Sequence, residues 1–296
     1  MRVGARTPSR RIAAACAALA GALLASGCGS SASVSSAVLS GPLDRAADVT
    51  AQAGSASTAI TIEVGAGGEP VLTMNGSGRF NLRSAEGEMT VEANAPSSSG
   101  LGSGSFTMTE LTKLPSTYIR TPLFEGKLPG GAQWLKVDSG GLLEHKLGLD
   151  LEGASQSNPA EFLSYLRATG AGVSLVGHES VRGVPTTRYR AALDLEKAVE
   201  RLPSNDRAQL RAAFAKLRAL IGSDEVPVEA WVDSANLVRR IAMRYPLSVE
   251  NQHITLAMSI EYFDFGPVRT IAAPPANEVY EATQAQLEGA FAGSSE

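Results

Sequence analysis

The sequence predicts an α+β domain in which a large, curved antiparallel sheet carries a few helices on one of its faces. Two observations support this fold class. From residue 57 onward, apolar and polar residues alternate over many short stretches, which is typical of strands with one buried and one solvated face. Short breaks rich in Gly, Asn and Ser separate these stretches, as in an antiparallel meander.

The most regular alternation lies in the C-terminal third of the chain. Residues 226–232 and residues 237–245 alternate on either side of a polar turn at residues 233–236. The next strand presents five apolar side chains on one face, those of Ile254, Leu256, Met258, Ile260 and Tyr262. Three consecutive strands of this kind predict a broad curved sheet with one continuous apolar surface.

Shorter strands are expected upstream of this region. They lie at residues 60–64, 89–93, 106–108, 134–137, 173–179 and 184–193. Turn-forming residues predict breaks at residues 65–68, 75–76 and 96–100.

Helices are expected at residues 43–53, 158–170, 195–221 and 277–291. The first has a loose apolar face made of Leu43, Ala46, Ala47 and Val49. In the second, Asn158 is placed to cap the helix and Pro159 to occupy its first position. The third carries an apolar stripe that contains Leu210, Phe214 and Leu217.

The N-terminus has the pattern of an export signal. Residues 1–11 contain four Arg and no acidic residue, and an uncharged run of thirteen residues follows at 12–24. That run is too short to span a bilayer of ~30 Å as a helix. A basic start with a short apolar core is typical of a signal peptide, so we expect residues 1–27 to be removed.

The segment that ends at Cys28 resembles the cleavage site of bacterial lipoproteins, where a Cys after small residues receives a diacylglyceryl thioether. Ala25 departs from that pattern, which usually has Leu at this position. We expect Cys28 to be the lipidated first residue and residues 28–42 to form a flexible tether rich in small residues. The alternative is ordinary cleavage near Gly27 with an unmodified thiol. Because Cys16 lies within the signal, no disulfide is expected in the mature chain.

The charge balance argues against nucleic acid as a partner. The chain carries a net charge of −4 at pH 7, and without residues 1–27 it has 22 basic and 30 acidic residues, a net charge of −8. Such a chain repels a phosphate backbone and has no polybasic attraction to anionic headgroups. We therefore expect the lipid on Cys28 to hold the protein at the membrane.

No catalytic pattern stands out in the sequence. The three histidines, His145, His178 and His253, are far apart and have no neighbouring Cys or paired His. A zinc site needs three or four clustered ligands. The chain also lacks a nucleophile elbow, a His-Glu-x-x-His motif and a phosphate loop. We expect no metal, no cofactor, no catalytic residue and no enzymatic activity.

Several motifs resemble one known family. Residues 173–189, which read VSLVGHESVRGVPTTRY, and the Asp-Leu pair at 194–195 resemble the central segment of the actinobacterial LolA/LppX-type (LprG-like) envelope lipoproteins. Residues 227–240 resemble the next hairpin of that family, and residues 263–275 resemble its closing strand and tail. The match covers residues 130–280 by motif and the earlier half by pattern, and none of the motifs is catalytic.

The resemblance implies a single domain over residues 43–296, with a half-barrel sheet wrapped around helices and a hydrophobic cavity that takes acyl chains. It implies an exported lipoprotein, anchored to the outer face of the cytoplasmic membrane, that binds and carries lipid, glycolipid or lipidated cargo. The alternative is a tethered interaction or sensor module of the same fold with a filled core; no protein partner is indicated. The residues expected to contact the ligand are Leu210, Phe214, Leu217, Ile254, Leu256, Met258 and Ile260.

Overall fold

The computed structural model describes residues 41–95, 104–114, 116–138, 159–167, 172–194, 221–249, 252–268 and 270–281, with residues 169, 196–197, 211, 215 and 218. The expected signal peptide, Cys28 and most of the expected tether lie outside these residues. So do Asn158, Gly170 and the stripe formed by Leu210, Phe214 and Leu217. What the sequence predicts for these residues stays a prediction.

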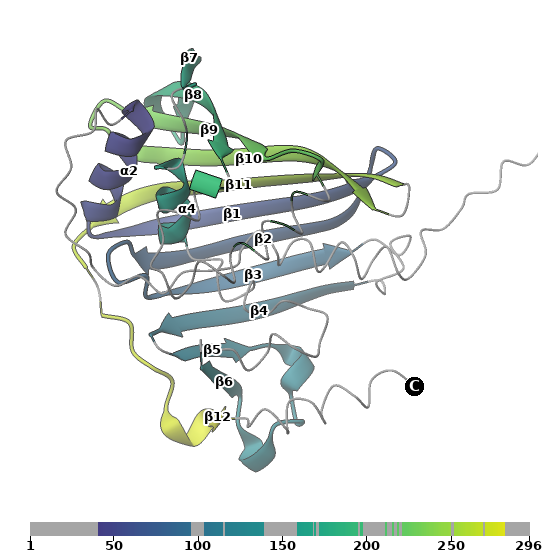
Figure 1. The fold of residues 1–296 in the computed structure, drawn as a ribbon. Coiled ribbons are helices and arrows are strands. Elements are labelled where there is room, and N and C mark those ends of the chain that lie inside the picture. Colours follow the sequence, from purple (N-terminus) through teal and green to yellow (C-terminus); the bar gives the residue numbers. More distant parts are fainter. Residues whose placement is uncertain are drawn as a thin grey trace, which may run out of the picture.

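All twelve strands of the described residues belong to one open sheet (Figure 1). Its order is β12-β6-β5-β4-β3-β2-β1-β11-β10-β9-β8-β7, and neighbouring strands are antiparallel except for the parallel pair β12 and β6. The strands are β1 Ser55–Ala66, β2 Glu69–Asn81, β3 Gly87–Ala95, β4 Gly104–Lys113, β5 Ser116–Arg120, β6 Trp134–Asp138, β7 Ser174–Val181, β8 Val184–Asp194, β9 Glu225–Asp233, β10 Val238–Val249, β11 Gln252–Gly266 and β12 Val279–Glu281. The predicted fold class, α+β with a large curved antiparallel sheet, is confirmed.

Two α-helices lie together on one face of this sheet, near the end where β1 starts (Figure 1). They are α2, Pro42–Gln52, and α4, Pro159–Leu166, both at predicted positions. Three short 3-10 helices complete the described elements: η2 Pro122–Phe124, η3 Pro129–Gly131 and η4 Ala276–Glu278. An ion pair of 2.7 Å between Arg167 and Asp48 joins the end of α4 to α2.

The buried stripe of α2 differs slightly from the expected one. It consists of Leu43, Ala46, Ala47 and Thr50. These positions follow the i, i+3, i+4, i+7 spacing of one helix face, whereas Val49 is only half-buried. Thr50 belongs to the stripe because its hydroxyl finds hydrogen-bond partners inside the core.

The first hairpin forms where the sequence predicts it. Ala66 pairs with Glu69, and the two residues between them, Gly67 and Gly68, have φ values of 62° and 91°. A two-residue hairpin turn with positive φ at both positions matches the twist of the flanking strands, and glycine adopts it without strain.

The expected turn at Asn75-Gly76 is wrong, because both residues lie inside β2, opposite Thr61 and Ile60 of β1. A Cβ at position 76 would lie 3.0 Å from the sulfur of Met89 on the neighbouring strand. The glycine therefore makes room for a core side chain instead of forming a turn.

The expected terminal helix is wrong at its start, since η4 and then the strand β12 occupy residues 276–281. Val279 pairs with Trp134 of β6, and Tyr280 packs against a small apolar cluster that includes Leu135. Pairing and packing with a distant strand thus override the local helical pattern. Residues 282–291 lie outside the described residues.

Candidate functional site: the apolar face of the sheet

The strand β11 brings four of the predicted ligand-contacting residues together on one face. Ile254, Leu256, Met258 and Ile260 are 1%, 2%, 5% and 0% exposed. Every second side chain of an extended strand points to the same face of its sheet, so the alternation in the sequence positions all four. Their burial is as expected, while their contact with a ligand stays a prediction.

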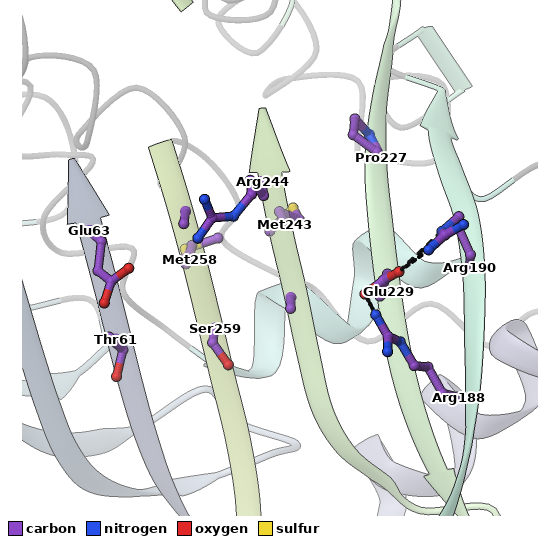
Figure 2. Close-up of a pocket in the computed structure, with 12 residues that line it drawn as sticks. Thr61, Glu63, Arg188, Arg190, Pro227, Glu229, Met243, Arg244, Met258 and Ser259 are labelled. Atoms are coloured by element: carbon purple, nitrogen blue, oxygen red, sulfur yellow. Dashed lines mark hydrogen bonds and ion pairs between the residues drawn. The ribbon is translucent and has the colours of Figure 1, made fainter. Parts of the chain in front are cut away.

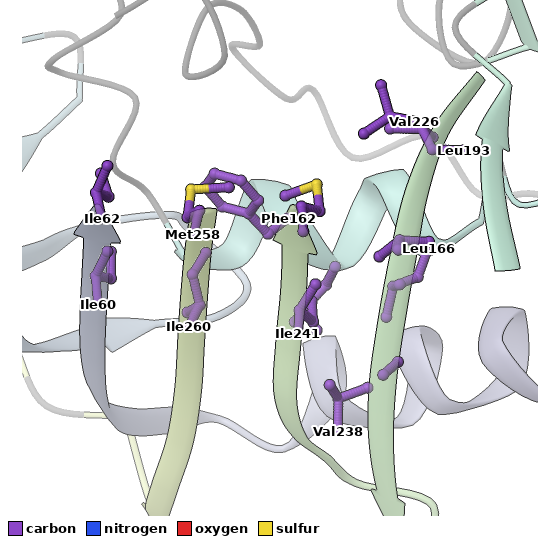
Figure 3. Packing of buried hydrophobic residues seen from close by; sticks show 14 of the residues in the cluster. Ile60, Ile62, Phe162, Leu166, Leu193, Val226, Val238, Ile241, Met258 and Ile260 are labelled. Carbon is purple, nitrogen blue, oxygen red and sulfur yellow. The ribbon is translucent and has the colours of Figure 1, made fainter. Parts of the chain in front are cut away.

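The strands on both sides of β11 widen this apolar stripe, part of which is drawn in Figure 3. The cross-strand rows are Ile60–Ile260–Ile241, Ile62–Met258–Met243 and Val64–Leu256–Tyr245, taken from β1, β11 and β10 in that order. Directly opposite side chains on antiparallel strands lie close enough to pack together. The result is a ladder of large apolar side chains that runs along the three strands.

Close packing of α4 fills one end of the ladder. Phe162 and Leu166 of α4 face Ile241 and Met243 of β10 across a residual cavity of only about 10 Å³. A space of that size is about the smallest that can hold one water molecule. This end of the face is therefore a packed core with no room for a ligand.

Three buried hydrogen bonds lie at this end, and two of them join a helix to the sheet. The hydroxyl of Tyr262 on β11 donates to the carbonyl oxygen of Pro159, the first residue of α4, over 2.6 Å. The hydroxyl of Thr50 on α2 donates to the carbonyl of Ala46 and accepts from the backbone N–H of Val238, at 2.7 Å and 2.8 Å. The bond to Thr50 pairs the buried N–H of Val238, and the bond to Pro159 pairs the buried hydroxyl of Tyr262; either group would be costly to bury unpaired.

At the other end the strands run on toward the turn between β1 and β2, past the position of the two described α-helices (Figure 1). We call the apolar surface there the far apolar half; it consists of Val64, Leu72, Tyr245, Leu247, Ile254 and Leu256. All six side chains are buried. Fully burying one Leu or Ile side chain stabilises the folded protein by about 1.5–3 kcal/mol relative to leaving that side chain exposed. Burial of these six side chains therefore contributes to the stability of the fold.

The far apolar half contains one polar atom, the hydroxyl of Tyr245. The residue is 2% exposed, and its hydroxyl has no hydrogen-bond partner among the described residues. Burial raises the pKa of Tyr245 well above 10, so the hydroxyl stays protonated and can donate.

A second polar group, the carboxyl of Glu110 on β4, lies on the same face of the sheet, opposite Met89 of β3. It is 5% exposed and accepts a hydrogen bond of 3.1 Å from the hydroxyl of Thr112. Burial raises the pKa of Glu110, and the hydrogen bond from Thr112 lowers it by a smaller amount, so the pKa is about 8. The carboxyl is therefore mostly neutral at pH 7. The sequence contains the signal for it, because the alternation through Phe106 and Met108 continues to Glu110.

The opposite face of the sheet is polar and holds an open groove of about 520 Å³, shown in Figure 2. Glu229 lies in it between Arg188 at 2.5 Å and Arg190 at 2.9 Å. Burial alone would raise the pKa of Glu229, but the hydrogen bonds from both arginines outweigh it and lower the pKa. Glu63 and Arg244 line the same groove. Ion pairs and solvated side chains thus occupy this face.

The described residues contain no group of three or more His, Cys, Asp or Glu side chains that could hold a metal ion. Within the same part of the chain, no helix is long and apolar enough to cross a membrane.

No protein-family model matches the sequence. An uncharacterized 31.2 kDa protein of Streptomyces griseus is 29% identical over 169 residues, which is 54% of this chain and 52% of that protein. The chain thus spans about half the length of this curated relative.

Among solved structures, the chain is similar to LprF from Mycobacterium bovis, with 12% identity and a TM-score of 0.39. That alignment covers 79% of this chain and 95% of LprF. It is also similar to the lipoprotein LppX from Mycobacterium tuberculosis, with 12% identity, a TM-score of 0.39, and coverage of 77% of this chain and 95% of LppX.

Proposed function

We propose that this chain is an exported envelope lipoprotein that is held at the outer face of the cytoplasmic membrane by Cys28 and binds and carries lipid. The acyl chains would lie on the far apolar half. One observation supports this location most directly: the ladder of β1, β11 and β10 continues beyond the end that α2 and α4 cover.

The energetics favour an acyl chain as the occupant. Transfer of one methylene group out of water contributes about 0.8 kcal/mol, so about ten methylenes supply about 8 kcal/mol. That gain exceeds the free energy of many local opening motions in proteins. This free energy is near zero for mobile loops. A face of Leu, Ile and Val side chains offers such a chain continuous dispersion contacts.

The proposal can be tested with Leu256→Trp, which places a large ring in the middle of the far apolar half. The full chain carrying Cys28→Ser, stripped of bound lipid, would be titrated with a fluorescent fatty acid. We expect Leu256→Trp to lower uptake of the probe at least tenfold at a nearly unchanged melting temperature, because it fills space that a ligand would use.

The matched control is Ala257→Trp, one residue further along the same strand. Ala257 pairs with Glu63 and Arg244 and lines the polar groove on the opposite face, so a Trp there should leave uptake unchanged. In a packed core, by contrast, an added ring costs about 1–3 kcal/mol. A wild-type protein that takes up no probe, together with a Leu256→Trp variant that melts markedly earlier, would refute lipid binding.

A second candidate function is a tethered interaction module of the same fold. The observation that favours it is the polar groove of about 520 Å³, which is lined by three arginines, Arg188, Arg190 and Arg244. Arg side chains are common at the centres of protein interfaces. The failure of lipid binding in the experiment above would leave this module as the better explanation.

A further inference from the structure

Tyr245 lies at the centre of the far apolar half. It pairs with Leu256 of β11, and its own strand places Met243 and Leu247 on the same face. In the neighbouring row of the same face, Leu247 pairs with Ile254 of β11. A hydroxyl group is therefore held among Leu, Ile and Met side chains, where no described residue accepts its hydrogen bond.

A second tyrosine on the same face provides a direct comparison. Tyr262 is six residues beyond Leu256 on β11, at the end of the sheet where α4 packs, and its hydroxyl donates to the carbonyl of Pro159. Six residues of extended strand span about 20 Å. The face therefore accommodates a buried tyrosine hydroxyl in two places, with a partner from the chain in only one of them.

An unpaired buried hydroxyl is unfavourable. Leaving such a group without a hydrogen bond costs about 1–3 kcal/mol, whereas a phenylalanine of nearly the same shape carries no such cost. A bound molecule that brings an acceptor to this position would recover the loss. An oxygen atom of a ligand is one such acceptor.

The surroundings narrow the chemistry of that oxygen. The neighbouring Arg244 is exposed and lines the polar groove of the opposite face, so its charge lies away from the hydroxyl. A carboxylate or phosphate would be buried there without a counter-charge, which is far more costly than burying a neutral carbonyl. Among neutral acceptors on a lipid, the ester carbonyl at the head of an acyl chain places the chain directly on the apolar ladder.

We propose that the Tyr245 hydroxyl donates a hydrogen bond to the ester carbonyl of an acyl lipid bound on the far apolar half. Tyr245 then determines specificity for acyl esters over plain hydrocarbons. This inference rests on the proposed function, since it requires that acyl chains bind to this half of the face.

The test compares two probes of equal chain length, methyl palmitate and hexadecane, on the lipid-free full chain carrying Cys28→Ser. We expect the ester to bind about tenfold more tightly than the hydrocarbon, as one buried hydrogen bond would give. Tyr245→Phe should abolish this preference, leave hexadecane binding unchanged and keep or raise the melting temperature. Tyr262→Phe is the matched control and should keep the preference for the ester.

The outcomes separate the two proposals. If neither probe binds to the wild-type protein, lipid binding itself is refuted. If both probes bind and Tyr245→Phe keeps the ester preference, only the role of Tyr245 is refuted. A marked loss of stability in Tyr245→Phe would also refute that role, because it would mean that the hydroxyl already has a partner within the folded chain.

Discussion

The hydroxyl of Tyr262 and the carbonyl oxygen of Pro159 are joined by a hydrogen bond of 2.6 Å across 103 positions of sequence. The bond ties the first residue of α4 to the last apolar residue of the β11 ladder. Both groups are buried, so water cannot replace either partner. This single contact helps to fix which end of the apolar face is covered by helix and which end lies beyond it.

We therefore expect Tyr262→Phe to lower the free energy of unfolding by about 0.5–1.5 kcal/mol, the usual net contribution of one hydrogen bond. Chemical denaturation of the full chain would measure the change. Tyr245→Phe is the control, because it removes the same hydroxyl from the same face at a position where no described residue binds it. Equal destabilisation by the two substitutions would contradict this assignment.

Thr50→Val tests the attachment of α2. The Thr50 hydroxyl accepts a hydrogen bond from the N–H of Val238. Valine has nearly the same shape as threonine but no hydroxyl, so it would leave this buried N–H unpaired. We expect a loss of about 1–3 kcal/mol in unfolding free energy. Thr50→Ser keeps the hydroxyl and loses only a methyl group, so it should stay closer to the wild type. The assignment fails if the Ser variant is the less stable of the two.

Much of the fold follows from local patterns that the sequence displays. The alternation from Ile254 to Tyr262 correctly assigns every second residue of β11 to the buried face, because strand geometry alone decides it. Pro159 correctly marks the start of α4, since its fixed φ suits the first helical position.

The errors arise where a distant part of the chain decides the local structure. Gly76 has the composition of a turn, but the side chain of Met89 from the next strand requires its small size. Residues 279–281 follow a helical pattern, yet pairing with β6 makes them a strand. The unpaired hydroxyl of Tyr245 depends on which groups surround it in three dimensions, so no sequence pattern reveals it.

Cys28→Ser tests the membrane anchor. We proposed above that a lipid on Cys28 is the attachment; without residues 1–27 the chain has a net charge of −8, which gives no electrostatic attraction to anionic headgroups. We expect the Ser variant to leave the membrane fraction and appear in the soluble fraction with an unchanged melting temperature. Cys16→Ser, within the expected signal peptide, is the control and should remain membrane-bound. If the Cys28→Ser protein still sediments with membranes after a high-salt wash, another anchor exists.

Glu110 gives the fold a defined dependence on pH. Its pKa is about 8 in the folded protein because of burial, against an ordinary value of 4.5 in the unfolded chain. Between these values the unfolded chain has released the proton while the folded protein retains it. The contribution of Glu110 to stability is therefore fully present below pH 4.5, decreases as the pH rises, and is lost by about pH 8.

Glu110→Gln should remove this dependence, because glutamine can still accept the hydrogen bond from Thr112 but cannot ionise. We expect the free energy of unfolding of the wild type to fall, relative to that of the variant, by about 1 kcal/mol per pH unit from pH 5 to pH 8. Denaturant titrations at several pH values would measure the difference. Glu92→Gln, at an exposed position of β3, should keep the slope of the wild type. Parallel pH profiles for the wild type and Glu110→Gln would show that Glu110 does not carry a buried proton.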